Sequence, residues 1–183
     1  MTRSVNPSQY LQQAELIHSQ KTVDTAIDAM AKQLNIDYAN EHPILLTVMG
    51  GAVYFTGQLL PKLTFALELD YVQATRYHGK TVGTQLKWVV MPKDSIKNRS
   101  VLIIDDILDE GLTLRAIADQ CKQQAAKDIK VAVLVEKLLN KAKPINANYS
   151  GLSVPNRYVF GCGMDVNGWW RNLPAIYALS NNS

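Results

Sequence analysis

The sequence predicts an α/β fold with a mostly parallel sheet flanked by helices. Nearly continuous apolar runs at 44–48, 101–104 and 129–135 are typical of strands buried on both faces of a parallel sheet. Turns that contain glycine follow the first two runs, and each turn leads into a helical pattern. A buried strand, a glycine turn and a helix N-terminus form the kind of junction at which open α/β sheets bind ligands.

The composition is that of one globular domain. The chain has 183 residues, of which 47% are hydrophobic and 19% charged. Because the net charge is only +3 and no block of Lys or Arg occurs, we expect no nucleic-acid partner. We find neither a signal segment nor a membrane span, so we expect a cytoplasmic protein without a membrane partner. Cys121 and Cys162 lie in different contexts and are expected to be free, buried thiols.

Two helices are expected before the first buried strand. A polar segment contains a helix start at Pro7-Ser8. A second helix is predicted at 22–34, because four apolar residues recur on one of its faces. These are Val23, Ile27, Met30 and Leu34. Residues 41–43 (Glu-His-Pro) end this pattern, and the strand at 44–48 follows.

Glycines and a third helix follow the strand at 44–48. The glycines of Met49-Gly50-Gly51 would let backbone amides approach an anion closely, although a tight turn alone would also explain them. The helix is expected from four apolar or aromatic residues. These are Val53, Tyr54, Leu59 and Leu60. Strands at 63–75 and 86–91 then flank a polar stretch at 76–85 that predicts a hairpin loop.

The stretch 101–113, VLIIDDILDEGLT, places four acidic residues between a buried strand and a helix that opens at Thr113. The acidic residues are Asp105, Asp106, Asp109 and Glu110. Backbone amides at 110–113, around Gly111, would suit a phosphate. Because carboxylates repel phosphate, the acidic residues call for sugar hydroxyls, Mg²⁺ or a proton to be removed. A helix cap with a solvated turn would explain an isolated acidic pair.

The last third of the chain is rich in loops. The strand at 129–135 ends at Lys137, which has an alternative explanation as a surface lysine whose stem covers apolar neighbours. Aromatic and polar residues recur after it, at 157–161, Asp165 and 169–174. The tryptophans at 169 and 170 are expected in the core or at an interface.

Together these motifs resemble the type I phosphoribosyltransferases, and among them the bacterial hypoxanthine-guanine enzymes. In that family two acidic residues follow a hydrophobic strand, and two apolar residues, a variable position and a Thr/Ser-Gly-x-Thr turn come next, as in 101–113. The matches cover residues 44–174 in the family's order. The resemblance implies the type I phosphoribosyltransferase fold, with a Rossmann-like core at about 40–140 and a small hood from about 1–20 and 141–183. It also implies a single domain over 1–183 and a homodimer or homotetramer.

The resemblance implies a purine salvage enzyme with Mg²⁺ as cofactor. Such an enzyme transfers the 5-phosphoribosyl group from phosphoribosyl pyrophosphate (PRPP) to N9 of hypoxanthine or guanine, giving IMP or GMP and pyrophosphate. Two alternatives stay open. One is a xanthine-preferring enzyme. The other is an RNA-binding attenuator of pyrimidine operons on the same fold, which typically carries tyrosine where Asp109 stands and needs a basic face.

The PRPP-binding residues implied by the resemblance come from three segments. Asp105 and Asp106 would bind the ribose hydroxyls and, with Asp165, the metal. The backbone of four residues and the Thr113 hydroxyl would hold the 5-phosphate. These four are Glu110, Gly111, Leu112 and Thr113. Pyrophosphate would contact Arg171 and the amides of Met49, Gly50 and Ala52, with Val48–Met49 as the candidate cis bond.

The purine-binding residues implied by the resemblance lie further along the chain. Lys137 would donate to O6, so adenine should be rejected. Tyr158 would stack on the purine, the main chain of Val159 would contact its edge, and Asp165 would face its exocyclic position. Asp109, placed near N7, would accept the proton that the base must lose.

The family also has a mobile lid, and this sequence differs from the family's pattern at three positions. The family closes a flexible loop, here 76–85, over a cationic transition state, with Tyr77 as its catalytic residue. Arg76 stands where the family has Ser, and Met49 where purine-specific relatives commonly carry Lys or Arg. Glu110 replaces Thr or Ser, and we expect its side chain to turn outward and leave only its amide for phosphate.

Overall fold

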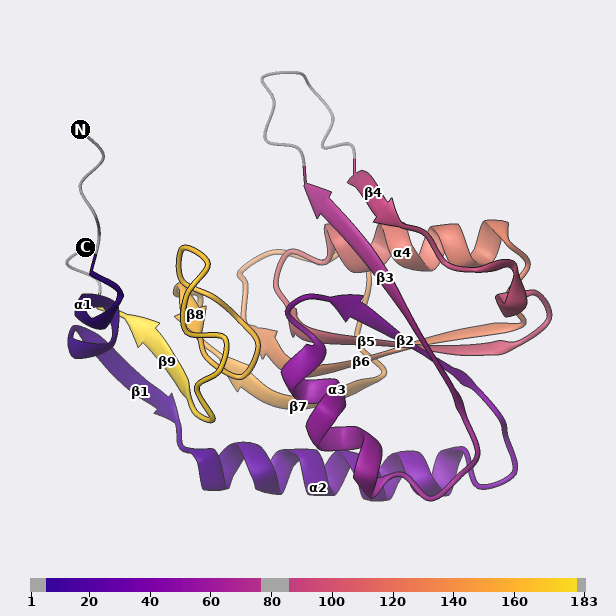
Figure 1. Cartoon of the computed structure of the whole chain (residues 1–183), viewed down its shortest axis with the longest axis horizontal. Coiled ribbons are helices and arrows are strands. Elements are labelled where there is room, and N and C mark those ends of the chain that lie inside the picture. The colour runs from indigo at the N-terminus through magenta and orange to yellow at the C-terminus, as the bar shows by residue number, and fades with distance from the viewer. Residues whose placement is uncertain (1–5, 77–85, 181–183) are drawn as a thin grey trace.

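The computed structural model describes residues 6–76 and 86–180. Over these residues the chain forms a six-stranded sheet, ordered β4-β3-β2-β5-β6-β7, and a three-stranded sheet, ordered β1-β9-β8 (Figure 1). The strands are β1 (Ala14–His18), β2 (Ile44–Met49), β3 (Glu68–Arg76), β4 (Leu86–Val90), β5 (Ser100–Leu108), β6 (Asp128–Lys137), β7 (Tyr149–Val154), β8 (Val159–Phe160) and β9 (Ile176–Leu179). The helices are α1 (Pro7–Gln12), α2 (Gln20–Asp37), α3 (Val53–Leu59) and α4 (Leu112–Gln123), with single 3-10 turns at Leu60–Lys62 and Asp94–Ile96.

The larger sheet is parallel except at one edge. Strands β3, β2, β5, β6 and β7 run in the same direction, and β4 pairs antiparallel with β3. The three apolar runs of the sequence become the neighbouring central strands β2, β5 and β6. The prediction of an α/β fold with a mostly parallel sheet is therefore confirmed.

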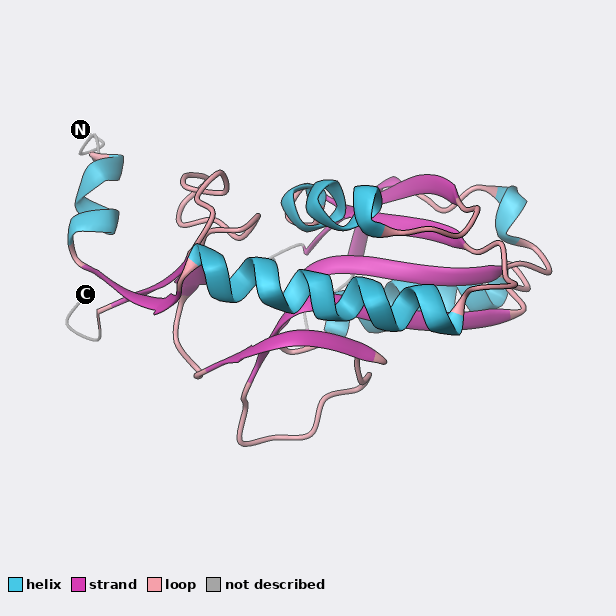
Figure 2. Ribbon diagram, turned by 90° about the horizontal axis from the view of Figure 1, so that it is seen from below, coloured by secondary structure: helices cyan, strands magenta, loops and turns pink. Residues whose placement is uncertain are grey.

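Helices cover both faces of this sheet. Helices α2 and α3 pack on one face and α4 on the other (Figures 1 and 2). Side chains of β5 alternate between the two layers: Leu102 and Ile104 pack with the α2 side, and Val101 and Ile103 pack with the α4 side. All four are fully buried. Full burial of each such side chain stabilises the fold by about 1.5–3 kcal/mol, and it is possible because β5 lies inside the sheet between β2 and β6.

Two strand boundaries differ from the expectations by more than two residues. Strand β3 begins at Glu68 rather than at 63. Strand β5 continues through Leu108 rather than stopping at 104, because its parallel pairing with β6 continues beside the acidic residues. Asp105 and Asp106 therefore lie within the strand, on opposite faces of the sheet, and not in the turn after it.

The three-stranded sheet joins the two ends of the chain. Strand β1 pairs antiparallel with β9, and β9 pairs with β8 (Figure 1). The indole of Trp170 donates to the carbonyl of Pro7 at 2.7 Å, which ties the loop after β8 to α1. We refer to this sheet, with α1, residues 155–158 before β8 and the loop 161–175, as the hood. Strand β7 falls in the range expected for the hood but pairs with β6 in the larger sheet.

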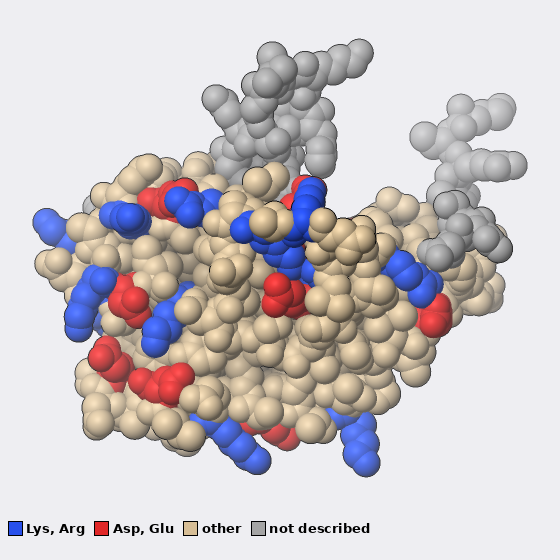
Figure 3. Space-filling model, turned by 180° about the vertical axis from the view of Figure 1, so that it is seen from behind, with Lys and Arg blue, Asp and Glu red and all other residues tan. Residues whose placement is uncertain are grey.

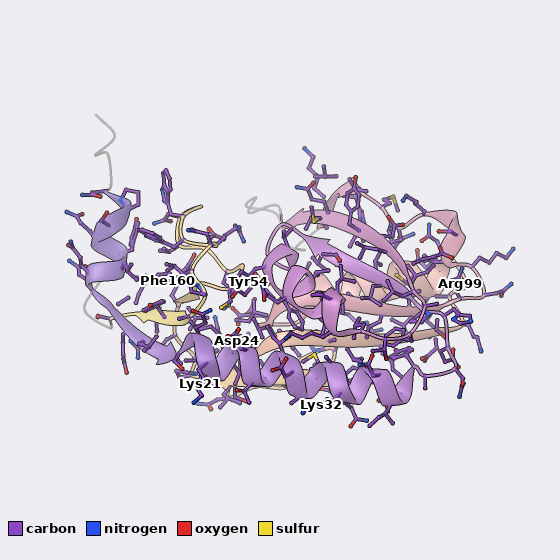
Figure 4. All side chains as sticks on the ribbon, turned by 60° about the horizontal axis from the view of Figure 1, so that its bottom comes forward. Lys21, Asp24, Lys32, Tyr54, Arg99 and Phe160 are labelled. Atoms are coloured by element: carbon purple, nitrogen blue, oxygen red, sulfur yellow. The ribbon has the colours of Figure 1, made fainter. Side chains whose placement is uncertain are left out.

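The amino ends and the carboxyl ends of the strands in the larger sheet have different environments. Arg99 precedes β5 and lies far from the hood, whereas Tyr54, at the start of α3, and Phe160, in the hood, lie at the other end (Figure 4). The Arg99 guanidinium donates to Glu68 at 2.8 Å and to the His42 carbonyl at 2.9 Å. The amino ends of the strands are thus tied together by a structural contact, and the carboxyl ends are left for ligands.

Candidate active site

Three segments that are distant in sequence meet at the carboxyl edge of the larger sheet. They follow β2, β5 and β6, which are adjacent and parallel. Residues 49–51 come from the first strand, 109–111 from the second, and Lys137 with the loop 138–148 from the third. Adjacent parallel strands bring such loops together at one edge, so the expected junction of strand, glycine turn and helix is present.

Two buried aspartates lie at the centre of this edge. Asp105 and Asp106 are each 8% exposed, and the Asp106 amide donates to the Asp105 carboxylate at 2.9 Å. Burial, and then the charge of Asp106, raise the pKa of Asp105 well above its ordinary value. Burial also raises the pKa of Asp106, against the opposing effects of its hydrogen bond with Asp105 and of the Arg171 charge. Paired carboxylates in this environment are stabilised by a cation or by hydroxyl donors.

The loop after β2 packs directly against the side chain of Asp106. A methyl group on Gly51 would lie 2.0 Å from the Asp106 Oδ2 atom, and one on Gly163 would lie 2.0 Å from the carbonyl oxygen of Gly51. Gly163 also has φ = +104°, a conformation that side chains rarely adopt. The two glycines therefore let the loop, the aspartate and the hood pack in direct contact.

Two expectations for this loop are corrected. The cis peptide bond lies at Met49–Gly50 and not at Val48–Met49. The amide of Ala52, the residue before α3, donates to the carbonyl of Val48 in β2 at 3.2 Å, so it is already used within the chain. Met49 is 36% exposed and lines a separate apolar hollow with Val53 and Tyr71.

A cavity of about 170 Å³ lies between β5 and the start of α4. We call it the phosphate hollow. It is lined by Asp105, Asp106, Ile107, Asp109, Gly111, Thr113 and Leu114. Gly111 caps α4 with φ = +80°, so the turn requires a residue without a side chain. Leu112, 44% exposed, turns away from the cavity.

The carboxylate of Glu110 is held from outside this turn. The Lys141 ammonium donates to it at 2.7 Å, and the Glu110 side chain is 40% exposed. The loop after β6 thus neutralises the negative charge that distinguishes this turn from the family pattern.

A second cavity, of about 230 Å³, lies between the sheet and the hood. We call it the base hollow. It is lined by Asp106, Ile107, Asp109, Lys137, Tyr158, Val159, Met164 and Asp165. The Lys137 ammonium donates to Asp109 at 2.6 Å, and the lysine side chain is only 12% exposed. The base hollow therefore presents a donor and an acceptor side by side.

The hood contributes an aromatic ring, a carboxylate and a guanidinium. Tyr158 is 52% exposed beside the base hollow, and burial and the charge of Asp165 raise the pKa of its phenol. Arg171 pairs with Asp165 at 2.5 Å and donates to the Gly163 carbonyl at 2.7 Å. These bonds fix Arg171 next to the loop 49–51, on the side of Asp106.

Most of the residues predicted from sequence line one of the two hollows, which share Asp106, Ile107 and Asp109. Sequence reasoning noted Gly51 as part of a glycine turn but missed its packing against Asp106. It also missed Gly163 and the apolar walls formed by Ile107 and Met164, for which the sequence gave no signal. Tyr77 and the rest of the expected lid, 77–85, lie outside the described residues.

The donor set can be tested against Mg²⁺. Among the described residues, no group of three or more His, Cys, Asp or Glu side chains gathers as a metal site. Mg²⁺, however, is usually bound through one or two carboxylates together with substrate phosphates. The buried pair Asp105 and Asp106 fits that mode, in which the substrate supplies the remaining oxygens.

A family model described as the phosphoribosyl transferase domain matches residues 13–167. The chain belongs to the phosphoribosyltransferase family. Membership of this family identifies the protein as a transferase.

Named relatives place the chain within this family. It is 32% identical to the hypoxanthine-guanine phosphoribosyltransferase of Streptococcus pneumoniae over 169 residues, which cover 90% of the chain and 92% of the relative. Its fold matches a hypoxanthine phosphoribosyltransferase from Staphylococcus aureus with a TM-score of 0.87, 26% identity and 97% of each chain covered. A hypoxanthine-guanine-xanthine phosphoribosyltransferase matches with a TM-score of 0.79 and 31% identity, covering 92% of the chain and 99% of that structure. The predicted type I phosphoribosyltransferase fold and the hypoxanthine-guanine branch are confirmed.

These findings favour the enzyme over the RNA-binding alternative. On the face shown in Figure 3, the described Lys and Arg residues are interspersed with Asp and Glu and form no continuous basic surface there.

Among the described helices, none is both long and apolar enough to cross a bilayer. Within the described residues Cys121 and Cys162 are free and buried, as expected.

Proposed function

We propose that the chain transfers the 5-phosphoribosyl group of PRPP to N9 of hypoxanthine or guanine, at the boundary of the two hollows. The observation that carries this proposal is the pair of Asp109 and Lys137 in the base hollow, next to the buried Asp105 and Asp106. The products would be IMP or GMP and pyrophosphate, which would make the protein a purine salvage enzyme. We also propose that it works in the cytoplasm.

The Asp109–Lys137 pair complements one edge of a 6-oxopurine. N7 and O6 are neighbours on that edge, so an ammonium can donate to O6 while a carboxylate accepts a proton from N7. Adenine carries an amino group at this place, which would face the Lys137 ammonium and leave donors without acceptors. Sites built around a hydrogen bond to the substrate can favour it over an analogue that lacks this bond by a factor of about 10⁴ to 10⁵.

The remaining residues act on PRPP. As the C1–O bond breaks, pyrophosphate leaves with the electron pair, the N9–C1 bond forms, and the base proton passes to Asp109. Asp105 and Asp106 accept hydrogen bonds from the ribose hydroxyls. The turn 110–113 holds the 5-phosphate, and Arg171 and the loop at Met49 and Gly50 hold pyrophosphate. By resemblance to the family we also propose a catalytic role for Tyr77, which lies outside the described residues.

Mg²⁺ fits this arrangement as cofactor. Asp105, Asp106 and Asp165 would hold it together with substrate oxygens, and it would supply positive charge to the leaving group. Burial raises the pKa of Asp105 and of Asp106, and a nearby positive charge would favour their ionised forms.

Turnover of the four purine bases with PRPP tests the proposal. We expect hypoxanthine and guanine to react and adenine not to react. Xanthine is the second candidate substrate, because a hypoxanthine-guanine-xanthine enzyme is among the similar structures. Adenine turnover comparable to that of guanine would contradict the proposal.

The variant Asp109→Asn tests the base in particular. Its turnover should fall by about 10² to 10⁴, as for loss of a general base, while the KM for PRPP changes far less. Asp119→Asn is the matched control, because Asp119 is an exposed α4 residue paired with Arg115. Turnover of Asp109→Asn within a few-fold of wild type would remove Asp109 from this role.

A homodimer or homotetramer is part of the proposal. Exposed apolar residues surround the hollow next to Met49, and large exposed apolar patches mark association sites. They are Met49, Val53, Leu69 and Tyr71. Sedimentation of the protein at several concentrations distinguishes the dimer, the tetramer and the monomer.

A further inference from the structure

Lys143 is a nearly buried lysine at the ends of β5 and β6. It lies in the loop between β6 and β7, and its side chain is only 9% exposed. Its ammonium donates to the carbonyl oxygens of Leu108 and Lys137, at 3.1 and 2.7 Å, and to the Glu136 carboxylate at 3.1 Å. An ammonium has three donors, and each of them has an acceptor here.

The acceptors are located where two strands end. Leu108 is the last residue of β5 and Lys137 the last residue of β6, and the pairing of these strands ends with Leu108 opposite Glu136. Lys143 thus continues the connection between the strands beyond their last paired residues. The next residue after Leu108 is Asp109. Lys143 therefore connects the backbone beside Asp109 to the backbone of Lys137.

The loop that carries Lys143 is itself fixed against the phosphate turn. A methyl group on Gly111 would lie 3.2 Å from the Ile145 Cγ2 atom and 3.4 Å from the Pro144 Cδ atom. The Arg115 guanidinium donates to the Pro144 carbonyl at 3.4 Å. Since both neighbours pack against α4 and its cap, Lys143 holds the strand ends from a defined position.

We propose that Lys143 is a positioning residue that sets the distance between Asp109 and Lys137, and so the fit of a 6-oxopurine. This inference rests on the proposed function. Without the ammonium, two strand-end carbonyls and the Glu136 carboxylate lose a charged donor, and the ends of β5 and β6 can separate. A displacement of about 1 Å can cost about 10²-fold in rate.

Lys143→Met tests this, with Lys62→Met as the matched control because Lys62 forms an exposed pair with Asp28. The variant should lower kcat/KM for hypoxanthine by roughly 10- to 100-fold and leave the KM for PRPP within about twofold. In a Lys137→Ala background the same substitution should change kcat/KM by less than about threefold, since residues that act through one contact are not additive.

Equal losses in both backgrounds would overturn the inference, because they indicate a general structural role. A parallel rise in the KM for PRPP would overturn it for the same reason. If Lys143→Met does not fold, Lys143→Arg decides in the same cycle, because its planar guanidinium keeps the charge but not the three-way geometry. Wild-type protein that transfers to no 6-oxopurine would instead overturn the proposed function.

Discussion

The two hollows of the site are built in opposite ways. The phosphate hollow is lined by one continuous stretch between Asp105 and Leu114, which contains a strand, a glycine turn and a helix start. The base hollow is lined by residues from β5, the end of β6 and the hood, from Asp106 to Asp165. One is made by local backbone conformation, and the other by tertiary contacts between distant segments.

This difference separates the binding of phosphate from the choice of the purine base. On the proposed function, the 5-phosphate of PRPP is a simple anion, which a short backbone turn can bind. Choice of a base requires side chains from several directions, which the topology of the sheet and the hood provides. Variants should therefore separate into those that affect one hollow and those that affect both.

The largest effect is expected for Gly51→Ala, because it displaces a wall that both hollows share. The added methyl group would overlap the Asp106 carboxylate. We expect kcat/KM to fall by more than about 10²-fold, with both PRPP and the base affected. Steady-state kinetics with each substrate varied checks this. Gly57→Ala is the control, since a methyl group there meets nothing within 4 Å. A loss confined to one substrate would contradict the shared wall.

An intermediate effect, on stability and on the KM for PRPP, is expected for Asp105→Asn. Asp105 lines only the phosphate hollow. Because burial raises the pKa of Asp105, its folded form binds a proton more tightly than its unfolded form. The free energy of unfolding therefore falls as pH rises from about 4, the ordinary aspartate pKa, through the raised value. The neutral asparagine lacks this loss.

Thermal unfolding across this pH range measures the effect. Asp105→Asn should unfold at a higher temperature than wild type at neutral pH, by about 2–4 °C for each kcal/mol. The gain should vanish near pH 4, and the KM for PRPP should rise. A gain that is the same at both pH values would show that the carboxylate is not the cause.

The smallest effect is expected for Glu110→Ala, whose side chain pairs with Lys141 and lines neither hollow. Removing its charge leaves Lys141 positive near the phosphate. The KM for PRPP should therefore fall by about twofold at low salt and return toward the wild-type value at high salt, where exposed charges are screened. A severe rise of this KM would mean that the side chain itself binds PRPP.

Much of the core and of the phosphate hollow could be predicted from sequence, because both depend on local patterns. The apolar runs of β2, β5 and β6 and the amphipathic α2 follow from hydrophobic period alone. The turn at Gly111 could be predicted because the glycine stands between an apolar strand and a helical pattern. The end of β5 could not be predicted, because acidic residues usually avoid strands and only the pairing with β6 keeps them there.

The hood and the walls of the base hollow could not be predicted in the same way. Strands β1, β8 and β9 are short, and they form because the two ends of the chain meet. The contact between Gly51, Asp106 and Gly163 joins three segments that no pattern links. The Lys143 contacts also depend on where a loop passes beneath two strand ends.

The pairing of β1 with β9 has a consequence for protein synthesis. Residues 176–179 must emerge from the ribosome before they can pair with residues 14–18. A nascent chain can therefore complete the turn at Gly111 long before the hood exists. A product that ends near residue 175 should therefore contain the turn at Gly111 but lack β9, which pairs with β1 and β8 and so supports the hood residues Asp165 and Arg171.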